Sequence, residues 1–268
     1  MKKRFRIGIA VSFLVCVGWL AQGHEFWMQP LKFYYAVGEQ LVVSFKVGEN
    51  FIGENWNLKR ERLIRVELHQ AKGVENIATL AVEREKDQLT IPLTQEGGQV
   101  VVMESNAAFV ELEAEKFNEY LKEDGLDEAL NIRAKNDMLD AVGKELYSRH
   151  TKLIVQTGTK KDDTWKKIFN LPIEIFPEQN PADLKPGSKV SFKVMYQGKP
   201  LFGARVRVWN RYQNRTIMQP IYTQQDGRIE AHISNPGMWM VSVVQMVPSD
   251  DPKADWRSYW GSLVFGVK

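Results

Sequence analysis

Histidines are the main candidates for metal or acid–base chemistry in this sequence, which has four of them: His24, His69, His150 and His232. A chain that begins at His24 carries a free α-amino group beside an imidazole, and both nitrogens can bind one metal ion in a chelate ring. The amine titrates at about pH 8 and the imidazole at about pH 6.5, so both are available near neutral pH. Nitrogen pairs of this kind favour copper(II) and nickel(II). His24 is therefore the first candidate ligand, and the alternative is that cleavage leaves a histidine there by chance.

Three further residues are candidates to complete such a site, namely Glu25, His150 and Met246. Glu25 follows His24 directly, and His150 lies where a helical region passes into a predicted strand. The alternative for His150 is a surface residue that only forms hydrogen bonds. Thioethers suit copper(I), but the nearby segment Met238–Met240 has the alternation of a buried core strand, so we expect core packing there.

The other histidines and the aromatic residues near the end of the chain have simpler interpretations. His69 and His232 each alternate with charged residues along a predicted strand, so we expect both at the surface and neither as a ligand. Trp256 and Trp260 are expected to pack against the rest of the protein. A glycan-binding surface is the alternative for these two tryptophans.

Catalytic motifs with a recognisable spacing are missing from the sequence. It has no glycine-rich phosphate loop, no His-Glu-x-x-His and no Gly-x-Ser-x-Gly. With four histidines and no motif around them, a hydrolase is not favoured. We therefore expect a binding protein, not an enzyme.

The first 23 residues have the pattern of a secretory signal. Four basic residues within the first six precede the apolar run Ile7–Leu20, and Ala21 and Gly23 are the small residues of a cleavage site. The apolar run is shorter than the 20 or so residues of a membrane span. Cleavage after Gly23 makes His24 the first residue of a periplasmic protein, and an uncleaved anchor is the alternative. Because Cys16 is the only cysteine, the mature chain would have no disulfide and no thiolate ligand.

Composition and charge restrict the class of partner. The chain has 268 residues, 44% of them hydrophobic, which is ordinary globular composition. Of its 36 basic and 33 acidic residues, 32 basic and 33 acidic remain after residue 23. That balance gives no support to nucleic-acid binding. No membrane-spanning segment is expected in the mature chain, so a transporter that works with it would be a separate protein.

The elements expected to carry these residues are mainly strands. Residues 26–112 alternate and turn like an antiparallel β domain, with strands over Leu63–His69 and Gly98–Glu104. Residues 113–147 are richer in helix formers and predict a helical insertion that includes a weaker stretch over Lys144–Tyr147. Gly125 is expected to cap the first helix.

The segment Pro177–Pro181 is typical of a domain edge. We therefore predict three parts: a signal peptide over 1–23, an N-terminal β domain over 24–176, and a C-terminal domain over 177–268. Strands and turns recur through the last part, including the hairpin signal Asp226-Gly227. Two antiparallel β-sandwich-like domains are expected, the second of immunoglobulin or transthyretin type.

Several segments, in collinear order, resemble a family of exported bacterial proteins. This is a domain-of-unknown-function family associated with NikM-like components of nickel or cobalt uptake. The segments that carry the resemblance are His24–Pro30, Phe117–Leu126, Glu145–Lys152, Leu171–Glu174, Asn180–Pro181, Gly198–Leu201, Ala204–Val206, Asp226–Arg228, Pro236–Trp239 and Asp255–Trp260. One departure is Gln245, which stands before Met246 where the family pattern has a histidine. His150 stands where relatives carry an aromatic residue, and is the candidate to replace that ligand.

The resemblance implies a periplasmic two-part β protein tied to transition metals. The leading hypothesis is an accessory protein that binds nickel, cobalt or copper through His24, helped by Glu25, His150 or Met246, and works with a separate membrane transporter. A second hypothesis is a metal-free envelope module that binds a glycan, a peptide or a protein. A third is a copper oxidase with a histidine brace, which requires a second histidine near His24.

Overall fold

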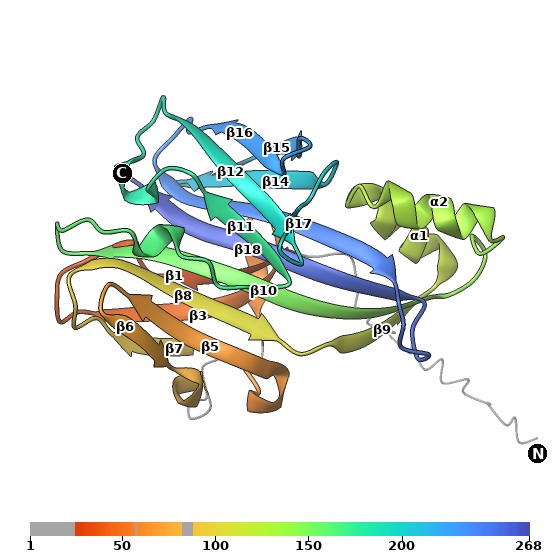
Figure 1. Ribbon diagram of the computed structural model, residues 1–268, viewed down its shortest axis with the longest axis horizontal. Helices are drawn as coiled ribbons and strands as arrows, with labels where there is room; N and C mark the ends of the chain where they lie inside the picture. Colours follow the sequence, from red (N-terminus) through yellow and green to blue (C-terminus); the bar gives the residue numbers. More distant parts are fainter. Residues whose placement is uncertain (1–24, 57, 82–87) are drawn as a thin grey trace, which may run out of the picture.

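The computed structural model describes residues 25–56, 58–81 and 88–268. The signal-peptide prediction and the predicted ligand His24 lie outside these residues. The described chain is mainly β, with open sheets and two short α-helices, as the sequence predicts (Figure 1). In the described residues, no helix is both long and apolar enough to cross a membrane.

A ten-stranded sheet forms the centre of the molecule. Its strands, in spatial order, are β15 (Arg215–Tyr222), β14 (Arg205–Tyr212), β17 (Gly237–Pro248), β18 (Trp256–Val267), β10 (Gly143–Thr157), β8 (Gly97–Ser105), β5 (Leu63–Gln70) and β6 (Gly73–Asn76), with β2 (Tyr34–Tyr35) and β9 (Ala108–Leu112) also paired to β10. Most of the pairs are antiparallel, but β10 runs parallel to the short β2 and to β18, with Glu145 opposite Trp256 and Leu153 opposite Val264.

Two smaller sheets pair the remaining described strands. One contains β1 (Glu25–Pro30), β3 (Gln40–Glu49), β4 (Ile52–Asn55) and β7 (Gln88–Pro92), and the other contains β11 (Ile173–Pro177), β12 (Lys189–Tyr196), β13 (Lys199–Pro200) and β16 (Arg228–His232). Short 3-10 turns link strands at η1 (Arg60–Arg62), η2 (Ala78–Ala81), η3 (Thr164–Lys166) and η4 (Pro181–Asp183). The two small sheets lie on either side of the central one (Figure 1).

Alternation along β17 divides the central sheet into two faces. Met240 packs in the core with β1 and β3, and we call this side the β1 face. Trp239, Val241 and Val243 pack with β11, β12 and β16, and we call this side the β12 face. The same alternation holds on β10, where Leu153 belongs to the β1 face and Ile154 to the β12 face. The prediction that Met240 packs in the core is confirmed.

Two helices cover one end of the β1 face. These are α1 (Ala114–Glu123) and α2 (Asp127–Lys135), which lie at one end of β17 and β18 (Figure 1). Phe117, Tyr120 and Leu121 of α1 are buried there against Val244 and Met246 of β17 and Trp256 of β18. The predicted helical stretch over Lys144–Tyr147 is wrong, because these residues form the start of β10. They pair there with β9 on one side and β18 on the other, and this pairing outweighs their helix propensity.

The predicted boundary near residue 177 falls inside a connected structure. Strands from both sides of it share the central sheet, since β10 pairs with β18 over nine consecutive positions from Glu145 to Leu153. The two predicted halves are therefore joined by backbone hydrogen bonds, in addition to packing between sheets.

Candidate functional site

Glu25 is the first residue of β1, and its carboxylate is buried with 4% of the residue exposed. The Nη1 of Arg207 lies 3.1 Å from its Oε1. Arg207 projects from the β1 face of β14, because its neighbours Val206 and Val208 pack on the β12 face. The pairing joins the beginning of the described chain to a strand from its last third.

Asp124 comes to the same arginine from the end of α1. It is 4% exposed and forms an ion pair with Arg207 Nη1. The helix ends in a Schellman motif: Gly125 N–H donates to Lys122 O, and Leu126 N–H donates to Leu121 O. Gly125 has φ +69°, a left-handed conformation that favours glycine. The prediction that Gly125 caps this helix is confirmed.

Two arginines also neutralise the negative end of α1. The Nη2 of Arg207 donates to Glu123 O at 2.6 Å, and Nη1 of Arg205 donates to the same carbonyl at 2.9 Å. Cations near a helix C-terminus interact favourably with its unpaired carbonyls and with the helix dipole. Arg207 therefore holds three groups at once, two carboxylates and a helix end.

Burial controls the protonation of this pair of carboxylates. It raises the pKa of Glu25, and the nearby charge of Arg207 and the Ser242 hydroxyl only partly offset that effect. Burial also raises the pKa of Asp124 to about 7, with Arg207 lowering it and Glu25 raising it further. Two carboxylates thus compete for one guanidinium, and this group carries excess negative charge whenever both are ionised.

A third buried carboxylate lies nearby under α1. Glu145 accepts a hydrogen bond from the Tyr120 hydroxyl at 3.2 Å and another from the Ser258 hydroxyl. Burial raises the pKa of Glu145 to about 7, although the hydrogen bonds from Ser258, Tyr120 and Trp260 oppose this. No cation pairs with Glu145 among the residues that the structure describes.

A small pocket that is partly open to solvent lies beside Glu25, Asp124 and Arg207. Glu25, Asp124, Arg205 and Arg207 line it, together with Ser242, Val243, Val244 and Trp260. We call the set Glu25, Asp124, Glu145 and Arg207 the acidic cluster. Titratable groups with strongly perturbed pKa values around a cavity mark a candidate functional site.

His150 lies away from the acidic cluster. It is even-numbered on β10 and so belongs to the β12 face, where it stacks on Tyr259 at 6.0 Å between ring centroids. Its Nε2 is 2.9 Å from the Ser148 hydroxyl. Burial, with the positive charges of Arg257 and Arg65, lowers the pKa of His150 to about 3, so the ring is neutral at physiological pH.

The other predicted residues occupy separate places. Met246 is on the β1 face but is buried in the apolar core beneath α1, together with Trp256. His69 pairs with Glu67 at 2.9 Å on the β12 face, and His232 is exposed on β16. The structure therefore separates His150 from Glu25 and Met246 by the thickness of the central sheet. In the described residues, no group of three or more His, Cys, Asp or Glu side chains is placed to hold a metal ion.

The sequence analysis missed Asp124, Glu145 and Arg207. Arg207 alternates with two valines on a strand, which is the ordinary pattern of a solvent-facing residue. Asp124 directly precedes the capping Gly125, and a charged residue at the end of a helix is ordinarily interpreted as exposed to solvent. Asp124, Glu145 and Arg207 come from three segments that are far apart in the sequence, and nothing in the residues around each one indicates that the fold places them close together.

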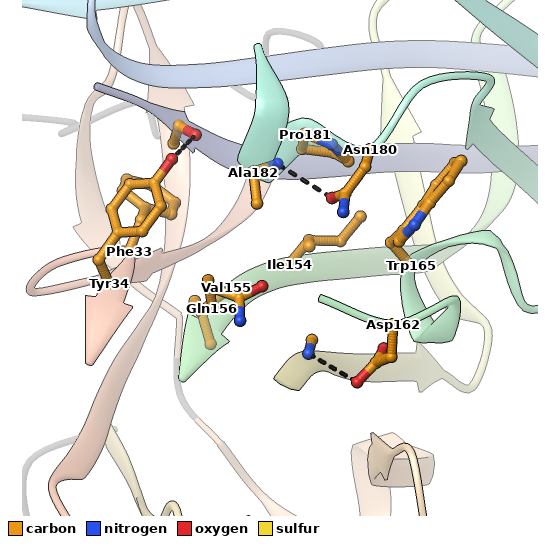
Figure 2. A pocket seen from close by; sticks show the side chains of 12 residues that line it. Phe33, Tyr34, Ile154, Val155, Gln156, Asp162, Trp165, Asn180, Pro181 and Ala182 are labelled. Atoms are coloured by element: carbon orange, nitrogen blue, oxygen red, sulfur yellow. Dashed lines mark hydrogen bonds between the residues drawn. The ribbon is translucent and has the colours of Figure 1, made fainter. Parts of the chain in front are cut away.

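A second pocket lies where β10 approaches η3 and η4 (Figure 2). The polar side chains that line it are already used in local structure. Asp162 accepts hydrogen bonds from Gly98 N–H and Thr164 N–H, Asn180 accepts one from Ala182 N–H, and Tyr34 donates to Gly266 O. The acidic cluster differs from this pocket because its buried carboxyl groups have raised pKa values and two of them share one cation, so we favour the acidic cluster as the candidate site.

The fold and the cluster define a mainly β protein with a buried ionic site at the edge of a helical insertion. The chain belongs to a family described as "Domain of unknown function (DUF4198)", whose model matches residues 21–247. No curated protein matches the sequence.

Similar solved structures have low identity to this chain. They include a tetra-tandem repeat from a large adhesion protein (6% identity, 91% of this chain and 49% of that chain, TM-score 0.23) and a Salmonella alpha-2-macroglobulin reacted with methylamine (11%, 90% and 14%, TM-score 0.21). Fibronectin(III)-like modules of Clostridium thermocellum CbhA are also similar (10%, 90% and 94%, TM-score 0.21). The chain thus spans about half of the first of these chains and a small part of the second.

Proposed function

We propose that the protein is an exported transition-metal-binding protein of the cell envelope, an accessory to nickel, cobalt or copper uptake or buffering. The amine and imidazole of His24 would supply two nitrogen ligands, and Glu25 would supply a carboxylate oxygen. The observation that carries the proposal is the acidic cluster, which begins at Glu25, the residue directly after the predicted first residue of the mature chain. The resemblance of His24–Pro30 to exported nickel- and cobalt-linked proteins supports the same assignment.

Electrostatics favours a cation at this position. Glu25 and Asp124 share Arg207, so a divalent ion would offset charge that one guanidinium leaves uncompensated. Asp124, whose pKa is raised to about 7 by burial, would lose its proton when a cation binds nearby. Binding is therefore expected to release protons and to strengthen as the pH rises from about 6 to about 8.

The test compares a mature protein that begins at His24 with one that retains Gly23 ahead of it. Copper(II), nickel(II) and cobalt(II) are titrated by calorimetry at about pH 7.5. Stoichiometric binding that the added glycine abolishes supports the terminal amine as a ligand. If neither protein binds any of the three ions, the metal proposal fails and a metal-free binding module becomes the better hypothesis.

Substitutions then separate the candidate ligands. Glu25→Gln is expected to weaken binding by about 10- to 100-fold, while the exposed Glu54→Gln serves as the control. His150→Ala is expected to leave the affinity unchanged, because His150 faces the other side of the central sheet. A loss of binding in His150→Ala would instead favour a two-histidine site and revive the histidine-brace hypothesis.

A further inference from the structure

Arg149, on β10, has an unusual environment for a cation. Its guanidinium carbon lies 4.8 Å from the ring centroid of Phe26, 5.0 Å from that of Tyr147 and 5.6 Å from that of Trp56. Three aromatic rings therefore surround a half-buried positive charge. Cation–π contacts offset part of the cost of removing a guanidinium from water, but they provide no counter-charge.

In the described part of the chain, no carboxylate lies within 4.0 Å of the Arg149 guanidinium. Burial lowers the pKa of Arg149, the Tyr147 hydroxyl opposes this, and the positive charge of Arg62 lowers the pKa further. By contrast, Arg65 and Arg207 each pair with a carboxylate. Arg149 is thus a partly buried charge that has a neighbouring charge of the same sign and no described carboxylate within 4.0 Å.

Arg62 approaches the same aromatic group from η1. Its guanidinium carbon lies 5.6 Å from the ring centroid of Trp56, and it has no carboxylate partner within 4.0 Å in the described residues. One short segment fixes the backbone of both arginines: Asn106 N–H donates to Arg62 O, and Arg149 N–H donates to the Ser105 hydroxyl. The fold therefore holds two like charges beside one indole, and a bound anion would offset the effect of Arg62 on Arg149.

We propose that Arg62 and Arg149 form an oxyanion site that binds the carboxylate of a small organic acid. A guanidinium presents two parallel N–H donors that match the two oxygens of a carboxylate. The rings around Arg149 lower the local dielectric, which strengthens that pairing, and they offer an apolar wall to the rest of the ligand. These rings favour an organic acid over a free phosphate ion, which is charged on every side.

This oxyanion site is separate from the acidic cluster. Glu25 and Phe26 are successive residues of β1, so their side chains point to opposite sides of the strand. Arg207 meets the first and Arg149 meets the second. A failure of the proposed metal function therefore leaves this inference standing, and the test uses metal-free protein.

The experiment titrates the metal-free mature protein with benzoate, acetate and inorganic phosphate at constant ionic strength and pH 7, by calorimetry. We expect one benzoate per chain, with acetate and phosphate weaker by about tenfold or more. Arg149→Gln and Arg62→Gln should each weaken benzoate binding by about tenfold or more. Arg60→Gln removes an exposed arginine from the same turn and should change nothing.

Arg149→Lys keeps the charge but loses the two-pronged donor, so it should bind benzoate more weakly than the natural protein and more tightly than Arg149→Gln. Because Arg62 is partly exposed and contacts one ring where Arg149 contacts three, Arg62→Gln tests the site even if Arg149→Gln fails to fold. No benzoate binding at tens of millimolar, or equal binding in Arg62→Gln and Arg60→Gln, would overturn the inference. Tighter binding of phosphate than of benzoate would overturn the assignment to an organic acid.

Discussion

The two sides of β1 contain opposite electrostatic arrangements. On one side, the carboxylates of Glu25 and Asp124 share the single guanidinium of Arg207. On the other side, the guanidinium groups of Arg149 and Arg62 lie against aromatic rings and no described carboxylate pairs with either. One strand thus separates a site with surplus negative charge from a site with surplus positive charge. Each surplus would be relieved by a ligand of opposite charge, which is why we assign a cation to one side and an anion to the other.

The difference also concerns how much each side depends on its arginine. Arg207 is a partner to two buried carboxylates and to the last carbonyl of α1, so its loss leaves several groups unsatisfied. Arg149 contacts rings that would pack against an apolar side chain as well. The same substitution should therefore have very different effects on the two sides.

The largest effect is expected from Arg207→Met. This change leaves Glu25 and Asp124 buried without the cation that pairs with them. Removing one partner of a buried ion pair lowers the free energy of unfolding by about 3–5 kcal/mol. Urea unfolding at pH 8 measures the loss in the free energy of unfolding. The loss should be smaller at pH 5, because carboxyl groups with raised pKa values are then protonated.

The matched control is Arg228→Met, which removes exposed ion pairs with Glu178 and Asp226 and should lower the free energy of unfolding far less than Arg207→Met does. Equal losses in the two variants would contradict the view that the acidic cluster depends on Arg207.

The next effect is the pH dependence caused by Asp124. Its pKa is about 7 in the fold and 3.8 as an ordinary side chain, so the native state keeps a proton that the unfolded chain releases. The free energy of unfolding should therefore fall as the pH rises from about 4 to about 7. The fall is at most about 1.4 kcal/mol for each unit by which the two pKa values differ. Asp124→Asn removes this contribution and should flatten the profile.

Glu145 complicates and checks this interpretation. Burial raises its pKa to about 7 as well, so Asp124→Asn should retain the part of the slope that belongs to Glu145. Glu145→Gln should flatten the profile by a comparable amount. The measurement is the free energy of unfolding at about pH 4.5, 6 and 7.5. If its dependence on pH is the same in both variants as in the natural protein, these carboxyl groups do not have raised pKa values.

The sequence predicts the elements of this fold better than their assembly. The strand over Leu63–His69 and the cap at Gly125 are confirmed, because alternation and capping are local properties. The start of β10 over Lys144–Tyr147 was predicted as helix, since only its pairing with distant strands determines its conformation. Parallel pairing of β10 with β18 has no local signal at all.

The candidate site is predictable only in part. Glu25 was identified from its place beside His24, and it lies in the acidic cluster. Asp124 and Arg207 were missed because burial of a charged residue depends on partners from remote segments. The roles of His24 and of a bound metal stay predictions, since His24 lies outside the described residues.

The smallest effect is expected from Arg149→Met. The variant loses cation–π contacts worth about 0.5–2 kcal/mol, but it also removes a half-buried charge that has no described anionic partner. These terms oppose each other, so the free energy of unfolding should change by about 1 kcal/mol or less in either direction. Urea unfolding of Arg149→Met and of Arg207→Met under the same conditions compares the two changes in the free energy of unfolding. A loss of about 3 kcal/mol or more would mean that Arg149 stabilises the fold as strongly as Arg207 does, and the proposed asymmetry across β1 would be wrong.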